Sequence, residues 1–211
     1  MDNENINRDK MAWAQKVVDD LNNSTDKYVV YRTSRPITDI KHMLTTSVEL
    51  YGDNVAFMQR FEKNEPFKSI TYNEAFDTVN SLGTALVNRG LKGKRIAVIG
   101  ENCYQWATSY LAVICGTGVV VPLDKELGAG ELKQLCIEAE VSAVMFTEKY
   151  AETFKEMKGS GDTSIELLIK LNGHKEFEDM LTWSGLIAEG KSLMDGGDRS
   201  FVDAEIAYDE M

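Results

Sequence analysis

RIAVIGENCYQWATSYLAVICGTGVVVPLD, residues 95–124, places two uninterrupted apolar runs on either side of an uncharged helical segment. The first run predicts a strand over 95–100 and the second a strand over 119–121, because continuous apolar runs suit strands covered by helices on both sheet faces. Asn102 with Gln105 predicts the cap of the intervening helix, which should reach about Cys115. The stretch therefore reads as one β-α-β unit.

The same alternation continues outward from this unit. Further strands are predicted over 141–147 and 165–171, so that four strands begin about 22–24 residues apart, with helices near 131–140 and 150–157 between them. Upstream, Thr71 and Glu74 form a Thr-x-x-Glu capping box for a helix that ends at Gly90. A last helix is predicted over 174–187, with the chain loosening from Gly190. The fold class is α/β, with a parallel, helix-covered sheet.

The amino-terminal part has a different character. Apolar spacing predicts a helix over 11–21 and a second one from Ile40 to Tyr51. Two short strands, 54–61 and 67–71, predict a β-hairpin in which Val55, Phe57 and Phe61 share one face. The chain therefore divides into a lead-in (1–44), an α/β subdomain (45–190) and an acidic, loosely structured segment (191–211). The helix over 11–21 should bury Trp13, Val17, Val18 and Leu21.

Composition restricts the partners. The 211 residues carry 23 basic and 34 acidic side chains, a formal net charge of −11, which argues against general nucleic-acid binding. The uncharged stretch 102–123 is interrupted by Gly116, Gly118 and Pro122, so a transmembrane segment is not expected. Three cysteines without metal-ligand spacing, and an amino terminus without an export signal, favour the cytoplasm.

Recognisable catalytic chemistry is missing. The sequence has no complete Gly-x-Gly-x-x-Gly and no Gly-x-Ser-x-Gly. The expected roles are structural for Gly116-Thr117-Gly118 (a helix end), for the Gly159-Ser160-Gly161 turn, for His42 and His174, and for the buried thiols of Cys103, Cys115 and Cys136. The acids Asp203, Glu205, Asp209 and Glu210 are expected to be solvated. No catalytic, cofactor-binding or metal residue is predicted.

Several motifs in order resemble the adenylate-forming superfamily, which contains acyl-CoA synthetases, peptide-synthetase adenylation domains and luciferases. Residues 70–90 resemble its Thr-Tyr-x-Glu helix, with Ala75 where the family has Leu. Residues 95–106 resemble its strand and Asn-x-x-x-Trp helix start, and 111–124 its helix, Gly and Val-Pro-Leu-Asp strand. The resemblance covers about 45–150 and looks nearest to bacterial long-chain fatty-acid–CoA ligases. It is carried by Tyr72, Glu74, Trp106, Pro122 and Asp124, all expected to be structural: Glu74 caps, Trp106 packs and Pro122 ends a strand.

The resemblance implies a parent enzyme that uses ATP, magnesium and coenzyme A to convert a carboxylate, through an acyl-adenylate, into an acyl-CoA. The family's phosphate loop and catalytic lysine have no counterpart in these 211 residues. The chain is therefore expected to be an inactive amino-terminal portion that binds no cofactor by itself, and an oligomer is possible. Three alternatives stay open: an adenylation domain for another carboxylate or an amino acid, a complete non-enzymatic α/β ligand-binding module, and a flavodoxin-like nucleotide binder.

Overall fold

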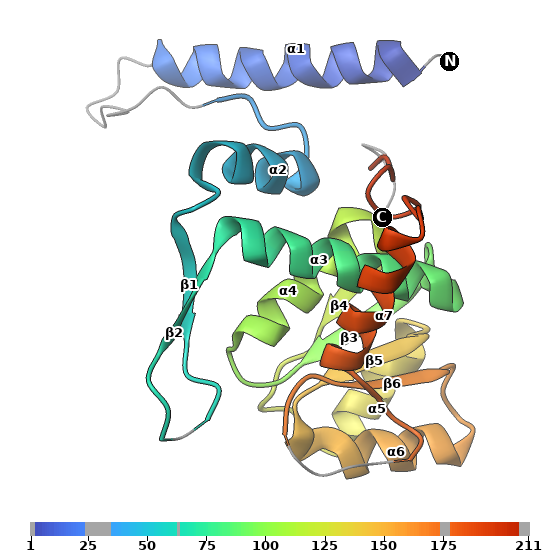
Figure 1. The fold of residues 1–211 in the computed structure, drawn as a ribbon. Coiled ribbons are helices and arrows are strands. Elements are labelled where there is room, and N and C mark those ends of the chain that lie inside the picture. Colours follow the sequence, from blue (N-terminus) through green and yellow to red (C-terminus); the bar gives the residue numbers. More distant parts are fainter. Residues whose placement is uncertain (1–2, 24–34, 63, 174–177, 207–211) are drawn as a thin grey trace.

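The computed structural model describes residues 3–23, 35–62, 64–173 and 178–206. An amino-terminal helix and a hairpin precede an α/β layer structure (Figure 1). The elements are α1 (Asn3–Asn22), α2 (Ile40–Tyr51), β1 (Val55–Gln59), β2 (Lys68–Thr71), α3 (Tyr72–Leu86), η1 (Val87–Leu91), β3 (Arg95–Ile99), α4 (Tyr104–Ala112), η2 (Val113–Thr117), β4 (Val119–Pro122), α5 (Ala129–Glu138), β5 (Ala143–Phe146), η3 (Glu148–Tyr150), α6 (Ala151–Ser160), β6 (Leu167–Lys170), β7 (Leu181–Thr182) and α7 (Trp183–Asp195).

The main sheet has five parallel strands in the order β4-β3-β5-β6-β7. The chain passes from β3 to β4 on one side and then returns to β5 on the other side of β3. This order is the flavodoxin-like arrangement. In it the strand order reverses within the sheet, and the loops at the carboxyl ends of the strands diverge at that point. The predicted α/β fold class with a parallel sheet is confirmed.

Helices cover both faces of this sheet, as its continuous apolar strands require. Side chains from α3, α4 and α7 pack with Ile96 and Val98 in one cluster, while α5 and α6 pack with Ala97 and Ile99 in the other. Within β3, the side chains of residues 96–99 are fully buried and Arg95 is exposed. Alternate residues of one strand therefore hold the two helical layers together.

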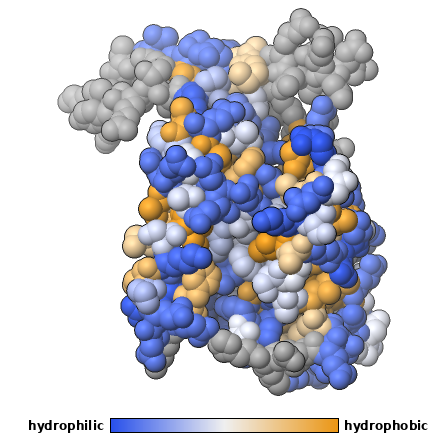
Figure 2. Space-filling model, in the orientation of Figure 1, coloured by the Kyte–Doolittle hydropathy of each residue, from blue (hydrophilic) through white to orange (hydrophobic). Residues whose placement is uncertain are grey.

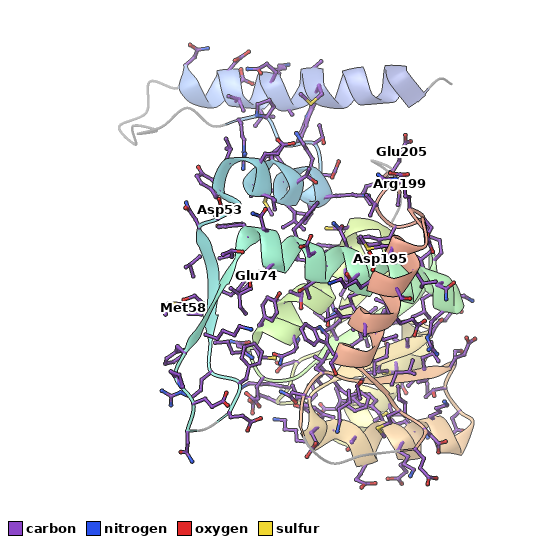
Figure 3. All side chains as sticks on the ribbon, viewed as in Figure 1. Asp53, Met58, Glu74, Asp195, Arg199 and Glu205 are labelled. Carbon is purple, nitrogen blue, oxygen red and sulfur yellow. The ribbon has the colours of Figure 1, made fainter. Side chains whose placement is uncertain are left out.

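The local signals at the ends of α3 act as the sequence predicts. Thr71 Oγ1 accepts from the Glu74 N–H and the Glu74 carboxylate accepts from the Thr71 N–H, which completes the capping box at the labelled end of α3 (Figure 3). Gly90 adopts φ +80° and ends the helix. Glycine is also required at 118, because a Cβ there would lie 2.2 Å from the Lys94 carbonyl oxygen.

The predicted hairpin is present, but the prediction of which apolar side chains share its buried face is wrong in part. β1 and β2 pair antiparallel, and the register shifts between Val55 and Phe57. Of the three side chains predicted to share a face, Phe57 packs on Tyr104, while Val55 and Phe61 are 52% and 40% exposed. The irregularity breaks the strict alternation on which the prediction relied. Apolar side chains are consequently exposed along the hairpin (Figure 2), and Met58 points outward (Figure 3).

The helix predicted over 174–187 is confirmed for 183–187, where α7 begins, and wrong for 178–182. Residues 174–177, with His174, lie outside the described residues. Leu181 and Thr182 extend the parallel sheet as β7, and Thr182 then caps α7 by accepting from the Gly185 N–H at 3.1 Å. The helix continues to Asp195 instead of loosening at Gly190. A Cβ on Gly190 would lie 1.7 Å from the Ser81 carbonyl oxygen, so this glycine serves close packing of α7 on α3.

Two further helix predictions need correction. The side chains of Asn102 and Gln105 do not cap α4, whose N-cap is Cys103 without a side-chain hydrogen bond. Among the α1 residues whose side chains are described, Ala14 and Val18 are buried, whereas Trp13 and Val17 are 51% and 39% exposed. The Leu21 side chain lies outside the described part. Within the described residues, no helix has both the length and the apolar character of a membrane span.

Candidate functional site at the carboxyl edge of the sheet

Charged residues follow three adjacent strands at the carboxyl edge of the sheet. Glu101 comes after β3, Lys125 after β4 and Lys149 after β5, and the Glu101 carboxylate accepts from Lys125 Nζ at 2.7 Å and from Lys149 Nζ at 2.8 Å. These two donors lower the pKa of Glu101 to about 2, and the same contacts raise the pKa of both lysines. One carboxylate therefore joins the loops that flank the reversal of strand order.

A second pair lies farther along the same edge and is much less exposed. The Lys170 side chain, 7% exposed at the end of β6, lies 3.3 Å from Glu148. Asn172 Oδ1 accepts from the Glu148 N–H at 3.2 Å. Thr147 Oγ1 is buried and has no hydrogen-bond partner among the described residues. Polar groups from β5 and β6 thus meet where a parallel sheet ordinarily meets its ligand.

A cavity of about 930 Å³ opens at this edge. It is bordered by the loop after β6, the start of α7, the start of α4 and the end of the hairpin. Its polar lining includes Gln105, Lys170 and Asn172, and its apolar lining includes Met180 and Trp183. Ligand pockets commonly combine such apolar walls with a few convergent polar groups.

The buried thiols and His42 lie away from this edge and have structural surroundings. Burial raises the pKa of Cys115 to about 12 and that of Cys136 to about 11, which keeps both thiols protonated and unreactive near neutral pH. His42 Nδ1 accepts from the Thr38 N–H at 3.1 Å, a structural role. No group of three or more His, Cys, Asp or Glu side chains able to hold a metal occurs among the described residues.

None of the residues that carried the family resemblance lines the cavity. Tyr72 and Glu74 start α3, and Trp106 packs on the core and stacks on Tyr110. Pro122 is the last residue of β4, and Asp124 Oδ1 accepts from the Glu126 N–H in the following turn. The roles predicted for Glu74, Trp106 and Pro122 are confirmed. That the chain holds no catalytic or cofactor-binding residue stays a prediction.

Sequence reasoning missed the residues that the fold brings together here. Four charged residues each lie at or just after the end of a predicted apolar strand: Glu101, Lys125, Lys149 and Lys170. That position in the sequence could have been used to predict that they lie near one another. In parallel sheets all such positions lie at one edge. Gln105 carried no comparable signal, because its contact with Gln59 joins two elements 46 residues apart.

The segment after α7 is anchored to α2 by one lysine. Lys41 Nζ donates to the carbonyl oxygens of Phe201, Val202 and Ala204 at 3.0, 2.9 and 2.6 Å. Phe201 is fully buried against Gly83 and Gly116. Arg199, beyond the end of α7 in Figure 3, forms an ion pair with Asp203 at 2.8 Å. Of the four acids predicted to be solvated, Asp203 is exposed as well as paired with Arg199, and Glu205 is exposed. Asp209 and Glu210 lie outside the described residues.

Comparison with known families and curated proteins gives consistent matches. The AMP-binding enzyme family matches residues 44–196. Long chain acyl-CoA synthetase 1 of Arabidopsis thaliana is 33% identical over 112 residues, 51% of this chain and 17% of the relative. Fatty acyl-CoA synthetase A of Dictyostelium discoideum is 32% identical over 108 residues, 51% of this chain and 16% of the relative. The aligned part thus spans about a sixth of the length of these relatives.

Solved structures share the fold. The A domain of a carboxylic acid reductase from Segniliparus rugosus superposes with a TM-score of 0.64 at 17% identity, covering 90% of this chain and 35% of that one. A long-chain-fatty-acid-CoA ligase from Archaeoglobus fulgidus gives a TM-score of 0.61 at 17% identity, covering 72% and 30%. At such identities the likeness concerns the fold alone.

Proposed function

Because the chain belongs to the AMP-binding enzyme family, we propose that it forms the amino-terminal portion of a long-chain fatty-acid–CoA ligase. The observation that carries the proposal is the agreement between the family match over 44–196 and relatives named as long-chain acyl-CoA synthetases at about 30% identity. Its runner-up is an adenylation domain for another carboxylate or for an amino acid.

The parent reaction has two steps. The carboxylate oxygen of a fatty acid attacks the α-phosphorus of ATP, which gives an acyl-adenylate and releases pyrophosphate. The thiol of coenzyme A then attacks the acyl carbon, loses its proton, and releases AMP with the acyl-CoA. Both steps hold anions together and require cationic and hydrogen-bond-donating groups preorganised around them.

The residues in hand do not fit ATP and magnesium. Residues 185–192 match the Gly-x-x-x-x-Gly-Lys-Ser pattern, but they lie inside helix α7 and form no loop around a phosphate. The described residues also lack a cluster of three or more possible metal ligands. We therefore assign the ATP and magnesium contacts of the parent to residues outside this chain. The 211 residues supply a helix-covered sheet on which such elements can be mounted. The three free thiols favour a reducing compartment, for which we propose the cytoplasm.

ATP–pyrophosphate exchange tests the proposal. We expect the 211-residue chain to show no exchange, and the product of the complete gene to exchange with palmitate but not with amino acids. Exchange stimulated by an amino acid alone would favour the peptide-synthetase alternative. A stop codon directly after Met211 would contradict the proposal and favour a self-contained module. Stoichiometric binding of ATP or FMN to the 211-residue chain would favour the flavodoxin-like alternative.

A further inference from the structure

Strongly exposed apolar side chains gather at the end of α2 and along the hairpin. Five of them, each between 46% and 64% exposed, are here called the hairpin face: Leu50, Tyr51, Val55, Met58 and Phe67. From β3 to the end of α7, in contrast, the described residues expose only two large apolar side chains, Leu135 and Ile137, at 38% and 39%. Concentrated apolar exposure of this kind marks a surface that is covered in the complete assembly.

The register of the hairpin separates its two faces. Phe57 lies opposite Ile70, and both pack in one cluster with Tyr104 of the protein body. Met58 lies opposite Ser69, and Met58 points outward (Figure 3). Because successive side chains of a strand alternate between faces, the hairpin is packed on one face and open to solvent on the other.

The hairpin also has too few strands to be stable alone. Each of β1 and β2 has one hydrogen-bonded neighbour among the described residues, and the pair stands beside α3 and α4, apart from the main sheet (Figure 1). A two-stranded sheet is marginally stable in water, and native proteins ordinarily cover or pair such edges. On the packed face, the Tyr104 N–H donates to Gln59 Oε1. No comparable contact serves the outer face within the described part of the chain.

Charge and chain length point to one occupant for this face. The chain carries a net charge of −11, so two copies repel each other. The aligned part is about a sixth of the curated relatives, and this chain covers 35% and 30% of two solved structures with the same fold. If the parent has a similar length, most of its apolar surface lies outside these 211 residues.

We propose that the hairpin face packs against an apolar segment of the parent protein that lies outside these 211 residues. The docking buries Met58 and Phe67 and leaves the packed face on Tyr104 unchanged. It rests on the function proposed above, because that function supplies the remaining chain. The face is therefore an internal interface of the parent and not a ligand site.

Oxidation of Met58 by hydrogen peroxide tests the docking on unmodified proteins, since exposed thioethers are oxidised faster than buried ones. Mass spectrometry gives the rate in the 211-residue chain and in the product of the complete gene. We expect Met58 to react at least roughly tenfold more slowly in the complete product. Met157, which is 5% exposed, should react slowly in both proteins and is the internal control.

The outcomes distinguish the docking from the proposed function. Equal oxidation rates of Met58 in the two proteins would overturn the docking, even where the complete product exchanges with palmitate. Protection of Met58 that grows with protein concentration would assign the face to a second copy and would also overturn it. Exchange with an amino acid alone, together with a protected Met58, would correct the proposed substrate and support the docking. A gene that stops after Met211 would overturn both.

Charged variants give a second, independent measurement. Met58→Glu should lower the melting temperature of the 211-residue chain by less than roughly 2 °C, because position 58 is solvated there. In the complete product the same change buries an unpaired carboxylate and should lower the melting temperature by at least roughly 3 °C. Leu135→Glu, at an exposed apolar position of α5, is the matched control and should shift either protein by less than roughly 2 °C. Equal shifts for both variants in the complete product would contradict the docking.

Discussion

Replacing Lys41 by Met should detach the segment after α7 from α2. Methionine preserves much of the aliphatic volume, but it removes all three donors to the carbonyl oxygens of residues 201, 202 and 204. A hydrogen bond from a charged donor contributes about 1.5–3 kcal/mol. The three bonds share one ammonium group, and burial lowers the pKa of Lys41 because it destabilises the charged form.

The net effect is therefore smaller than three separate bonds. We expect the free energy of unfolding to fall by about 2–3 kcal/mol, and the melting temperature to fall by about 5–10 °C for a chain of this size. Urea unfolding followed by circular dichroism at pH 7.5 measures the first quantity. Limited proteolysis should also reveal earlier cleavage between Gly196 and Ala204 in the variant.

Lys191→Met is the matched control. Lys191 is exposed on α7, and its side chain forms no hydrogen bond or ion pair among the described residues. Its replacement should change the free energy of unfolding by less than about 0.5 kcal/mol. If Lys41→Met resembles this control in both assays, the three hydrogen bonds do not hold the segment in place and the argument fails.

Three other measurements follow from the contacts described. In a urea titration, Gly190→Ala should lower the free energy of unfolding by at least about 1–3 kcal/mol, because α7 must move away from α3. Gly159→Ala is the control. A Cβ at position 159 meets open space, so this variant should be neutral or stabilising in the same titration. Carbon-13 NMR should place the pKa of Glu101 at about 2, and Lys125→Met should raise this pKa. The stabilisation of the folded state by the Glu101 carboxylate is complete above the unfolded-state pKa near 4.5. It is lost as the pH falls through about 2. Cys115, whose pKa burial raises to about 12, should react with a disulfide reagent at pH 8 only after unfolding, as absorbance at 412 nm would show.

The fold was predictable where the signal was local. The capping box of Thr71 and Glu74, the left-handed Gly90 and the evenly spaced apolar strands each depend on neighbouring residues, and each is present in the structure. The errors arose where distant residues decide. β7 has only two residues, and its pairing with β6 is what makes Leu181 and Thr182 a strand. Gly190 looked like a helix end because its contact with Ser81 is invisible in sequence.

The candidate site was less predictable than the fold. Lys170 appeared to be an ordinary strand residue, and only the order of the strands brings it to Glu148 and to the start of α7. Gln105 looked like a capping residue, but the hairpin supplies Gln59 as its partner. Strand order and hairpin docking are tertiary properties, so the donors around the cavity could be recognised as a group only from coordinates.

The Lys41 contacts also bear on the order of events during synthesis. Their acceptors lie 160 to 163 positions downstream, so helix α2 leaves the ribosome long before they exist. At about 5–20 residues per second the delay is roughly 8–32 s. Throughout that interval the nascent lead-in lacks the contact that fixes it to the end of the layer structure, and during this window a chaperone could engage it.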